Sequence, residues 1–192
     1  MLNMTRIIAG IAGSLKLASP AKSTRPTSDR IRESIFARLE SRDELEGASV
    51  LDLYAGTGAL ALEAASRGAS VVRLVERDGK AAAVCVANLK LIAKALDKEE
   101  IELDGSVVNK SVSSFLETSQ DIFFDVVFID PPYEISSEEV ATNLEALERM
   151  LKQGSTVIVE RSSRDTAPVW PEGYVLEDTK NYGDTTVYWL KN

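Results

Sequence analysis

Between residues 49 and 161, short apolar runs alternate with longer stretches in which apolar side chains recur at helical spacing. Short apolar runs separated by helices are typical of a parallel sheet that is covered on both faces. The runs that predict strands span residues 49–54, 70–76, 104–109, 123–129 and 155–161. The stretches that predict helices span residues 59–67, 78–96, 111–118 and 136–152.

The last part of the chain follows a different pattern. Segments 174–181 and 185–190 are separated by Gly183 and Asp184, with no room for a helix. We therefore expect these two segments to pair as an antiparallel hairpin. The sequence predicts an α/β fold in which five wound parallel strands are closed by a hairpin.

The first residues predict a small ribbon and a helix ahead of the sheet. Residues 1–26 form an irregular basic extension that a two-strand ribbon explains. A helix is expected over residues 27–41, because apolar side chains recur on one face and Thr27 or Ser28 can cap its amino end. We expect this β-ribbon extension to be followed by a single globular domain over residues 27–192.

Composition restricts the chemistry that the fold can support. The 192 residues include no histidine, which excludes Ser-His-Asp triads, Cys-His pairs and histidine-ligated metals. The single cysteine, Cys85, forms no intrachain disulfide and no zinc site of the usual ligand types, which leaves only a carboxylate magnesium site open. No apolar run approaches the ~20 residues that span a bilayer. We expect a reduced, cytoplasmic, monomeric protein with no bound metal and no membrane contact.

The net charge of −8 is unevenly distributed. Residues 1–38 hold seven basic and two acidic side chains, a net charge of +5, whereas the remainder carries −13. A polyanion would be attracted to the amino-terminal end and repelled elsewhere, because electrostatic fields are screened over about 8 Å at physiological salt. Nucleic-acid binding at that end and an ordinary solvated helix face both fit this distribution.

Residues 51–60, LDLYAGTGAL, predict a strand that enters a tight glycine turn and then a helix. Gly56 and Gly58 allow the backbone to approach a ligand closely. Ala61 completes a loose dinucleotide fingerprint, and Glu76 follows 20 residues after Gly56, where a carboxylate would meet ribose hydroxyls. The turn therefore indicates a cofactor that contains adenosine, and NAD fits it nearly as well as S-adenosylmethionine.

Asp52 favours S-adenosylmethionine over NAD. It interrupts an apolar strand four residues before Gly56, and a buried carboxylate without a partner is costly. The methionine end of S-adenosylmethionine carries an ammonium group that would offset this cost, and NAD has none. A capping role toward the backbone amides of the turn is the alternative for Asp52.

A second motif follows the predicted strand at 123–129. Asp130 ends the apolar run and precedes Pro131, Pro132 and Tyr133, at the rim where open α/β sheets bind ligands. A carboxylate, nearby carbonyls and an aromatic ring suit a planar molecule with an exocyclic amine. When such an amine attacks a methyl group, its nitrogen becomes cationic and acidic, so a carboxylate stabilises the transition state and accepts the proton.

With both motifs placed, the sequence resembles the class I S-adenosylmethionine-dependent methyltransferases, and more narrowly the RsmD family. That family methylates the N2 amine of one guanine in bacterial small-subunit (16S) ribosomal RNA, guanine-966 in its reference numbering. The resemblance implies a Rossmann-like, mostly parallel sheet of seven strands. It covers nearly the whole chain and rests on RIIAG (6–10), TRPTSDRIRE (24–33), LDLYAGTGALALEA (51–64) and DPPY (130–133).

The resemblance assigns roles to individual positions. Residues expected to bind the cofactor are Asp52, Ala55, Gly56, Thr57, Gly58, Glu76, Arg77, Ser111 and Val112. Those expected to bind and activate the amine are Asp130, Pro131, Pro132 and Tyr133. The residues expected to contact the RNA follow instead from the positive charge of the amino-terminal end and are Lys16, Arg25, Arg30 and Arg32.

Two positions depart from the family's pattern. Ser111 stands where such families often have an acid or an amide. The ribbon of the family carries several basic residues, whereas in this stretch of the ribbon Lys16 is the basic residue that remains. We therefore expect the ribbon to bind RNA more weakly than in the family.

Three other functions fit parts of the sequence. DNA adenine-N6 methylation uses a similar Pro-Pro-aromatic motif, but only about 48 residues precede the first core strand, which is short for a sequence-reading domain. Protein glutamine methyltransferases favour Asn at the position of Asp130. A non-catalytic module that binds NAD or another nucleotide is the alternative outside the enzymes.

Overall fold

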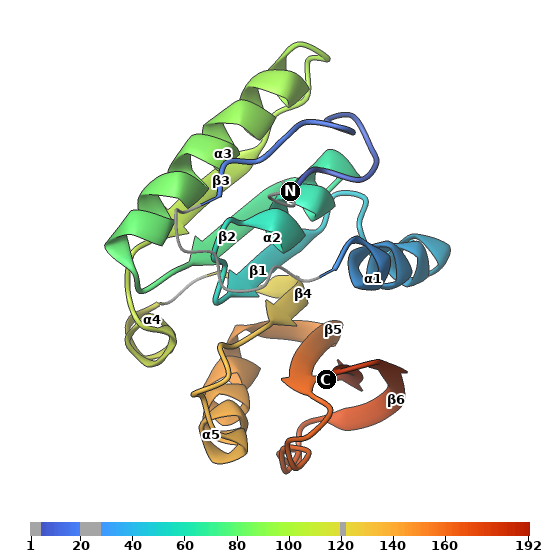
Figure 1. Cartoon of the computed structure of the whole chain (residues 1–192), viewed down its shortest axis with the longest axis vertical. Helices are drawn as coiled ribbons and strands as arrows, with labels where there is room; N and C mark the ends of the chain where they lie inside the picture. Colours follow the sequence, from blue (N-terminus) through green and yellow to red (C-terminus); the bar gives the residue numbers. More distant parts are fainter. Residues whose placement is uncertain (1–4, 20–27, 120–121) are drawn as a thin grey trace.

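The computed structural model describes residues 5–19, 28–119 and 122–192 and contains one sheet with helices on both faces. The sheet has seven strands in the order β3-β2-β1-β4-β5-β7-β6 (Figure 1). The strands are β1 (Ser49–Leu53), β2 (Val71–Val75), β3 (Asp104–Val108), β4 (Phe124–Ile129), β5 (Leu151–Ser162), β6 (Val175–Tyr182) and β7 (Thr185–Lys191). The helices are α1 (Asp29–Ser41), α2 (Ala59–Ser66), α3 (Gly79–Asp97), α4 (Val112–Thr118), α5 (Ser137–Leu147) and a 3-10 turn η1 (Glu148–Met150).

The predicted α/β architecture is confirmed. Strands β1 to β5 run parallel, whereas β7 runs antiparallel to both β5 and β6. The predicted helix over 136–152 is too long, because α5 gives way to η1 and β5 already begins at Leu151, which pairs with Phe124.

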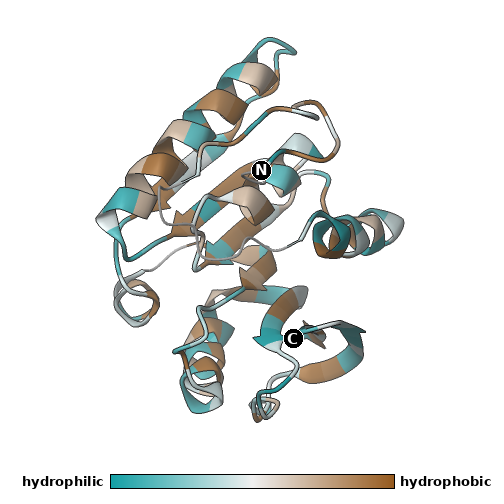
Figure 2. Cartoon of the chain, in the orientation of Figure 1, coloured by the Kyte–Doolittle hydropathy of each residue, from teal (hydrophilic) through white to brown (hydrophobic). Residues whose placement is uncertain are grey.

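Two apolar cores lie on the two faces of the sheet. Helices α1, α2 and α3 cover one face, and α4 and α5 cover the other. Figure 2 shows the strongest hydrophobic colouring on the central strands, while helices such as α3 carry both colours. This pattern explains why the parallel strands appear in the sequence as continuous apolar runs.

The amino-terminal segment (residues 5–18) belongs to the first of these cores. Its two arms meet at an antiparallel bridge between Arg6 and Lys16, so the described part is a short ribbon. Ile7 and Leu17 are buried in the core that α1, α2 and α3 cover. The domain boundary predicted at residue 26 lies outside the described residues.

Helix α1 lies on the same face of the sheet as the amino-terminal segment and contacts the carboxyl-terminal hairpin. Ser28 caps α1 by accepting a hydrogen bond from the Ile31 amide. Farther along the helix, Arg38 pairs with Asp178 on β6 and its guanidinium lies 4.2 Å from the ring centroid of Trp189 on β7. The helix thus closes one end of the sheet over β7 and β6.

Candidate active site

Two loops that are distant in sequence lie side by side at the carboxyl edge of the sheet. The glycine turn (residues 54–58) follows β1, and the Pro-Pro loop (residues 130–133) follows β4. Strands β1 and β4 are parallel neighbours, with Leu53 opposite Ile129. Both motifs therefore meet at one edge, and this edge is the candidate active site.

The backbone of the glycine turn adopts conformations that demand its glycines. Tyr54, Gly56 and Gly58 have φ values of 87°, 55° and 81°. A Cβ at Gly58 would lie 2.8 Å from Leu74 Cδ2, whereas a Cβ at Gly56 would meet no atom within 4 Å. Gly58 thus lets α2 start against the core, and Gly56 faces open space at the edge of the sheet.

Asp52 is a buried carboxylate with one unsatisfied oxygen. Its side chain is 1% exposed, and Oδ2 accepts a hydrogen bond of 3.3 Å from the Ala61 amide in the first turn of α2. Oδ1 is buried and has no hydrogen-bond partner among the described residues. Burial raises the pKa of Asp52 to about 7, the Ala61 hydrogen bond opposes this, and the charges of Asp130 and Glu76 add to it. A cationic ligand group would satisfy this oxygen and stabilise its charge.

Glu76 connects the end of β2 to the glycine turn. Its two oxygens accept hydrogen bonds from the Gly56 amide (2.9 Å) and the Asp78 amide (2.8 Å). Asn109, which follows β3, donates to the Glu76 carbonyl (2.8 Å) and to the Arg77 carbonyl (3.0 Å). These hydrogen bonds connect the turn to the ends of the two strands.

The other predicted cofactor positions surround the same edge. Arg77 does not pair with Glu76. Its exposed guanidinium instead lies 3.5 Å from the carboxylate of Glu134, next to the Pro-Pro loop. Ser111 caps α4 by accepting a hydrogen bond of 3.2 Å from the Ser114 amide, and the side chain of Val112 is 6% exposed.

The Pro-Pro loop places a carboxylate and an aromatic ring at the mouth of the site. Asp130 is half-buried, Pro131 is buried and Tyr133 is 71% exposed. The Pro132 carbonyl accepts a hydrogen bond of 3.0 Å from the Ile135 amide, which leaves it one further lone pair as an acceptor. An exposed ring beside a half-buried carboxylate can stack on a planar base while the acid contacts its amine.

Three buried polar side chains at this edge were not predicted from the sequence. Asn143 on α5 donates a hydrogen bond of 2.8 Å to the Tyr54 hydroxyl, and Asn88 on α3 contacts the glycine turn from the opposite face. Glu160 is 5% exposed and, because Ile129 pairs with Val159, comes beside Asp130 on the neighbouring strand. Asn88 and Asn143 each interrupt the apolar face of a helix, and Glu160 ends the apolar run of β5; these were the available signals.

The residues predicted to contact RNA have different environments. Lys16 and Arg30 are exposed, and Arg25 lies outside the described residues. Arg32 is fully buried: its Nη2 donates to the Arg6 carbonyl (2.9 Å) and to Asp29 (2.8 Å), and its Nη1 lies 3.9 Å from Glu63. The prediction that Arg32 contacts RNA is therefore wrong, because its guanidinium fastens the amino-terminal segment to α1.

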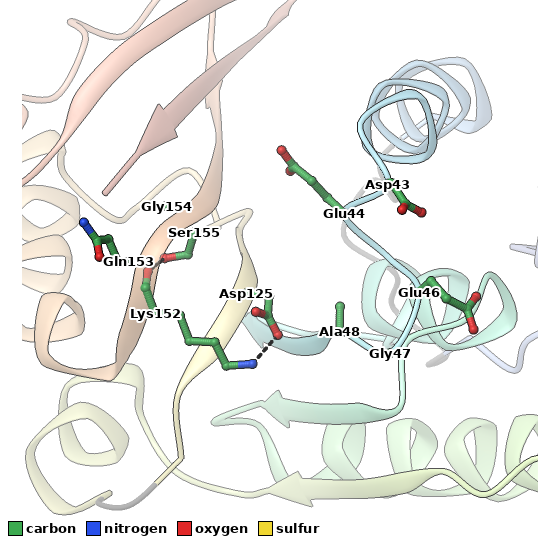
Figure 3. Close-up of a pocket in the computed structure, with 10 residues that line it drawn as sticks. All are labelled: Asp43, Glu44, Glu46, Gly47, Ala48, Asp125, Lys152, Gln153, Gly154 and Ser155. Atoms are coloured by element: carbon green, nitrogen blue, oxygen red, sulfur yellow. Dashed lines mark hydrogen bonds and ion pairs between the residues drawn. The ribbon is translucent and has the colours of Figure 1, made fainter.

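A shallow hollow of about 330 Å³ lies at the opposite edge of the sheet (Figure 3). Its lining residues, which include Asp43, Glu46, Asp125 and Lys152, precede or begin β1, β4 and β5. The hollow is therefore at the amino ends of these strands, away from the candidate active site. Within the described ranges no group of side chains could hold a metal ion, and none of the described helices is long and apolar enough to cross a membrane.

Comparisons with known proteins agree with this geometry. A family described as "Conserved hypothetical protein 95" matches residues 5–191. The Haemophilus influenzae protein named ribosomal RNA small subunit methyltransferase D is 33% identical over 180 residues, which are 93% of this chain and 89% of that protein. The solved structure of Thermus thermophilus protein TTHA0928 has a TM-score of 0.79 and 28% identity, with 96% of this chain and 97% of that chain covered.

A more distant structure shares the fold. Magnesium protoporphyrin IX methyltransferase from Synechocystis, solved with bound S-adenosylmethionine, has a TM-score of 0.63 and 14% identity, with 85% of this chain and 78% of that chain covered. The fold, a seven-stranded sheet that ends in an antiparallel hairpin, is that of the class I methyltransferases, and the Escherichia coli structure titled "Putative methyltransferase yhhF" shares it at a TM-score of 0.80 and 29% identity, with 99% of this chain and 98% of that chain covered. The buried, half-satisfied carboxylate of Asp52 fits a cofactor with an ammonium group.

Proposed function

The chain belongs to the RsmD family, described as conserved hypothetical protein 95, and from this membership we propose that it methylates the N2 amine of one guanine in small-subunit ribosomal RNA. The proposed nucleotide is guanine-966 in the family's reference numbering. The proposal is supported by one observation above all: a buried carboxylate with an unsatisfied oxygen, Asp52, lies one strand away from a half-buried carboxylate at the mouth of the site, Asp130.

The glycine turn and its neighbours would hold the cofactor. Asp52 Oδ1 would accept a hydrogen bond from the ammonium group of the methionine end, and Gly56 would let that end lie close to the backbone. Glu76 would accept from the ribose hydroxyls with the lone pairs that its two amide contacts leave over. Bound S-adenosylmethionine supplies an electrophilic methyl group on a sulfonium centre.

The Pro-Pro loop would hold the base. Tyr133 would stack on the guanine, a contact worth about 1–3 kcal/mol per base in proteins that bind single strands. The Asp130 carboxylate would accept a hydrogen bond from the N2 amine, orient it and take the proton released as the nitrogen becomes cationic. The guanine must be unstacked to reach this position, because a paired amine is inaccessible inside a helix.

Nucleoside mass spectrometry of ribosomal RNA tests this function directly. Cells that lack the gene are compared with cells rescued by the wild type or by Asp130→Ala. We expect one N2-methylguanosine to disappear with the gene, to return with the wild type and to stay absent with the variant. A digest that retains every N2-methylguanosine without the gene would contradict the proposed substrate.

Purified protein distinguishes the alternative functions. Asp130→Ala is expected to bind S-adenosylhomocysteine as the wild type does and to lose at least about 100-fold in turnover. A melting temperature that rises with NAD and not with S-adenosylhomocysteine would favour the nucleotide-binding module. Methyl transfer to DNA adenine or to a protein glutamine, with none to ribosomal RNA, would favour the other two enzymes.

A further inference from the structure

Asn88 is a buried amide on an otherwise apolar helix face. It lies on α3 among Cys85, Leu89 and Ile92 and is 2% exposed. Its Nδ2 donates to the Ala18 carbonyl (3.0 Å) and to the Thr57 carbonyl (2.9 Å). Its Oδ1 accepts from the Ala18 amide at 2.8 Å. A buried amide is tolerated in such a place only when it is hydrogen-bonded in this way.

These contacts fix both the position and the orientation of the carboxamide. Both hydrogens of Nδ2 face carbonyl oxygens, and Oδ1 faces an N–H group. A flipped amide would place its oxygen against two carbonyl oxygens and its NH2 against a donor, so one orientation alone satisfies the partners. The same carboxamide therefore holds Ala18 and Thr57 at a fixed separation.

The two partners belong to two different parts of the proposed machinery. Thr57 lies in the glycine turn, directly before Gly58, whose amide donates to the Ala55 carbonyl at 2.7 Å. Ala18 ends the amino-terminal segment and lies two residues after the exposed Lys16. Asn88 is thus a direct link between the turn that would hold the cofactor and the segment that would contact RNA.

The rest of the amino-terminal segment is fastened elsewhere. Glu63 on α2, fully buried, accepts hydrogen bonds from the amides of Ile8 (2.7 Å) and Ala9 (3.0 Å). Ser66 on α2 accepts from the Ala12 amide (2.9 Å) and donates to the Ala9 carbonyl (2.6 Å). These contacts hold the segment without touching the glycine turn, and they provide a matched comparison for Asn88.

We propose that Asn88 is a positioning residue that couples cofactor binding to RNA binding by tying Thr57 to Ala18. When the cofactor orders the glycine turn, the hydrogen bond to the Thr57 carbonyl fixes the Asn88 side chain. The hydrogen bonds between Asn88 and Ala18 then fix the end of the amino-terminal segment in the conformation that binds RNA. Thermodynamic linkage requires the reverse effect to be equal, so bound RNA strengthens cofactor binding by the same factor. The coupling rests on the proposed function, because it needs RNA at the amino-terminal segment.

The coupling is measured with S-adenosylhomocysteine and 16S ribosomal RNA transcribed in vitro. Calorimetry gives the Kd for S-adenosylhomocysteine, and fluorescence anisotropy gives the RNA Kd with and without saturating S-adenosylhomocysteine. We expect the wild type to bind RNA at least about fivefold more tightly with S-adenosylhomocysteine present. Asn88→Ala is expected to weaken S-adenosylhomocysteine binding about five- to tenfold and to abolish the difference between the two RNA affinities.

Two further variants separate positioning from loss of structure. Ala18→Pro changes an exposed residue and removes one of the two hydrogen bonds between Asn88 and residue 18: the amide of residue 18 no longer donates to Oδ1, and its carbonyl still accepts from Nδ2. It should lower the coupling toward one and leave the Kd for S-adenosylhomocysteine within about twofold of the wild type, because the Thr57 contact remains. Ser66→Ala should loosen the segment and weaken RNA binding, yet retain the coupling. If Asn88→Ala does not fold, Ala18→Pro and Ser66→Ala still decide the question.

The proposal is overturned if wild-type RNA affinity is the same with and without S-adenosylhomocysteine. It is also overturned if Ala18→Pro keeps the wild-type coupling, or if folded Asn88→Ala binds S-adenosylhomocysteine as the wild type does. A wild type that binds S-adenosylhomocysteine but no RNA would instead contradict the proposed function. The affinities of Asn88→Ala and Ser66→Ala for S-adenosylhomocysteine would then still show whether Asn88 holds the glycine turn.

Discussion

The pH dependence of cofactor affinity tests the environment of Asp52 directly. Burial raises the pKa of Asp52 from 3.8 to about 7, so at pH 5.5 only roughly 3% of this side chain is ionised, against roughly 90% at pH 8. An ammonium group binds the ionised form. We therefore expect the Kd for S-adenosylhomocysteine to be about 30-fold higher at pH 5.5 than at pH 8.

The same shift has a consequence for the protein without ligand. Between about pH 4 and pH 7, the folded protein holds a proton on Asp52 that the unfolded chain has lost. The free energy of unfolding therefore falls as pH rises through this window, by about 4 kcal/mol from this group alone. Saturating S-adenosylhomocysteine should reduce that fall, because it stabilises the ionised carboxylate.

The assay is calorimetric titration at pH 5.5, 6.5, 7.5 and 8, with circular dichroism to verify the fold at each pH. Asp52→Asn keeps an oxygen for the Ala61 amide but cannot ionise. We expect this variant to bind about 10- to 100-fold more weakly at pH 8 and to show no pH dependence. Adenosine, which lacks the methionine end, should bind the wild type with the same Kd at every pH.

Three outcomes would refute this reasoning about Asp52. The first is a wild-type Kd for S-adenosylhomocysteine that is equal at pH 5.5 and pH 8. The second is a pH dependence that persists in Asp52→Asn. The third is an adenosine Kd that follows the same profile, because the effect would then not arise at the ammonium group.

Further predictions concern stability and RNA binding. Gly58→Ala would add a Cβ 2.8 Å from Leu74 Cδ2 at a φ of 81°, and should lower the free energy of unfolding by about 2–3 kcal/mol in urea denaturation. Arg32→Met should cost about 3 kcal/mol in the same measurement and leave the salt dependence of RNA binding unchanged, since Arg32 is buried. Arg30→Ala should make the plot of the logarithm of the RNA association constant against log salt less steep, by the amount that one phosphate contact contributes. It should leave the urea midpoint unchanged. Tyr133→Ala should raise the KM for RNA about tenfold while S-adenosylhomocysteine binds as before.

Arg32 shows where prediction from sequence fails. In the sequence it is one of several arginines in a basic stretch, so it was predicted to contact RNA together with Arg30. In the structure Arg30 is exposed and Arg32 is buried against Glu63, two positions along the same helix. Residues two apart face different sides of a helix, and which side is covered depends on the amino-terminal segment packing there.

The amino-acid order by itself determined the alternation of strands and helices, the closing hairpin and the two loops that follow β1 and β4. These features follow from local rules, because hydrophobic periodicity and glycine conformations act over a few neighbouring residues. The alternation does not specify the order of the strands, so the pairing of β1 with β4, which places both loops at one edge, was decided by the tertiary structure.

Tertiary structure alone decided which polar side chains became buried and what each one contacts. The half-satisfied carboxylate of Asp52, its pKa near 7 and the Asn88 link between Thr57 and Ala18 all depend on residues far apart in the chain. The physical reason is that desolvation and buried hydrogen bonds are set by the atoms that surround a group, and distant segments supply most of those atoms.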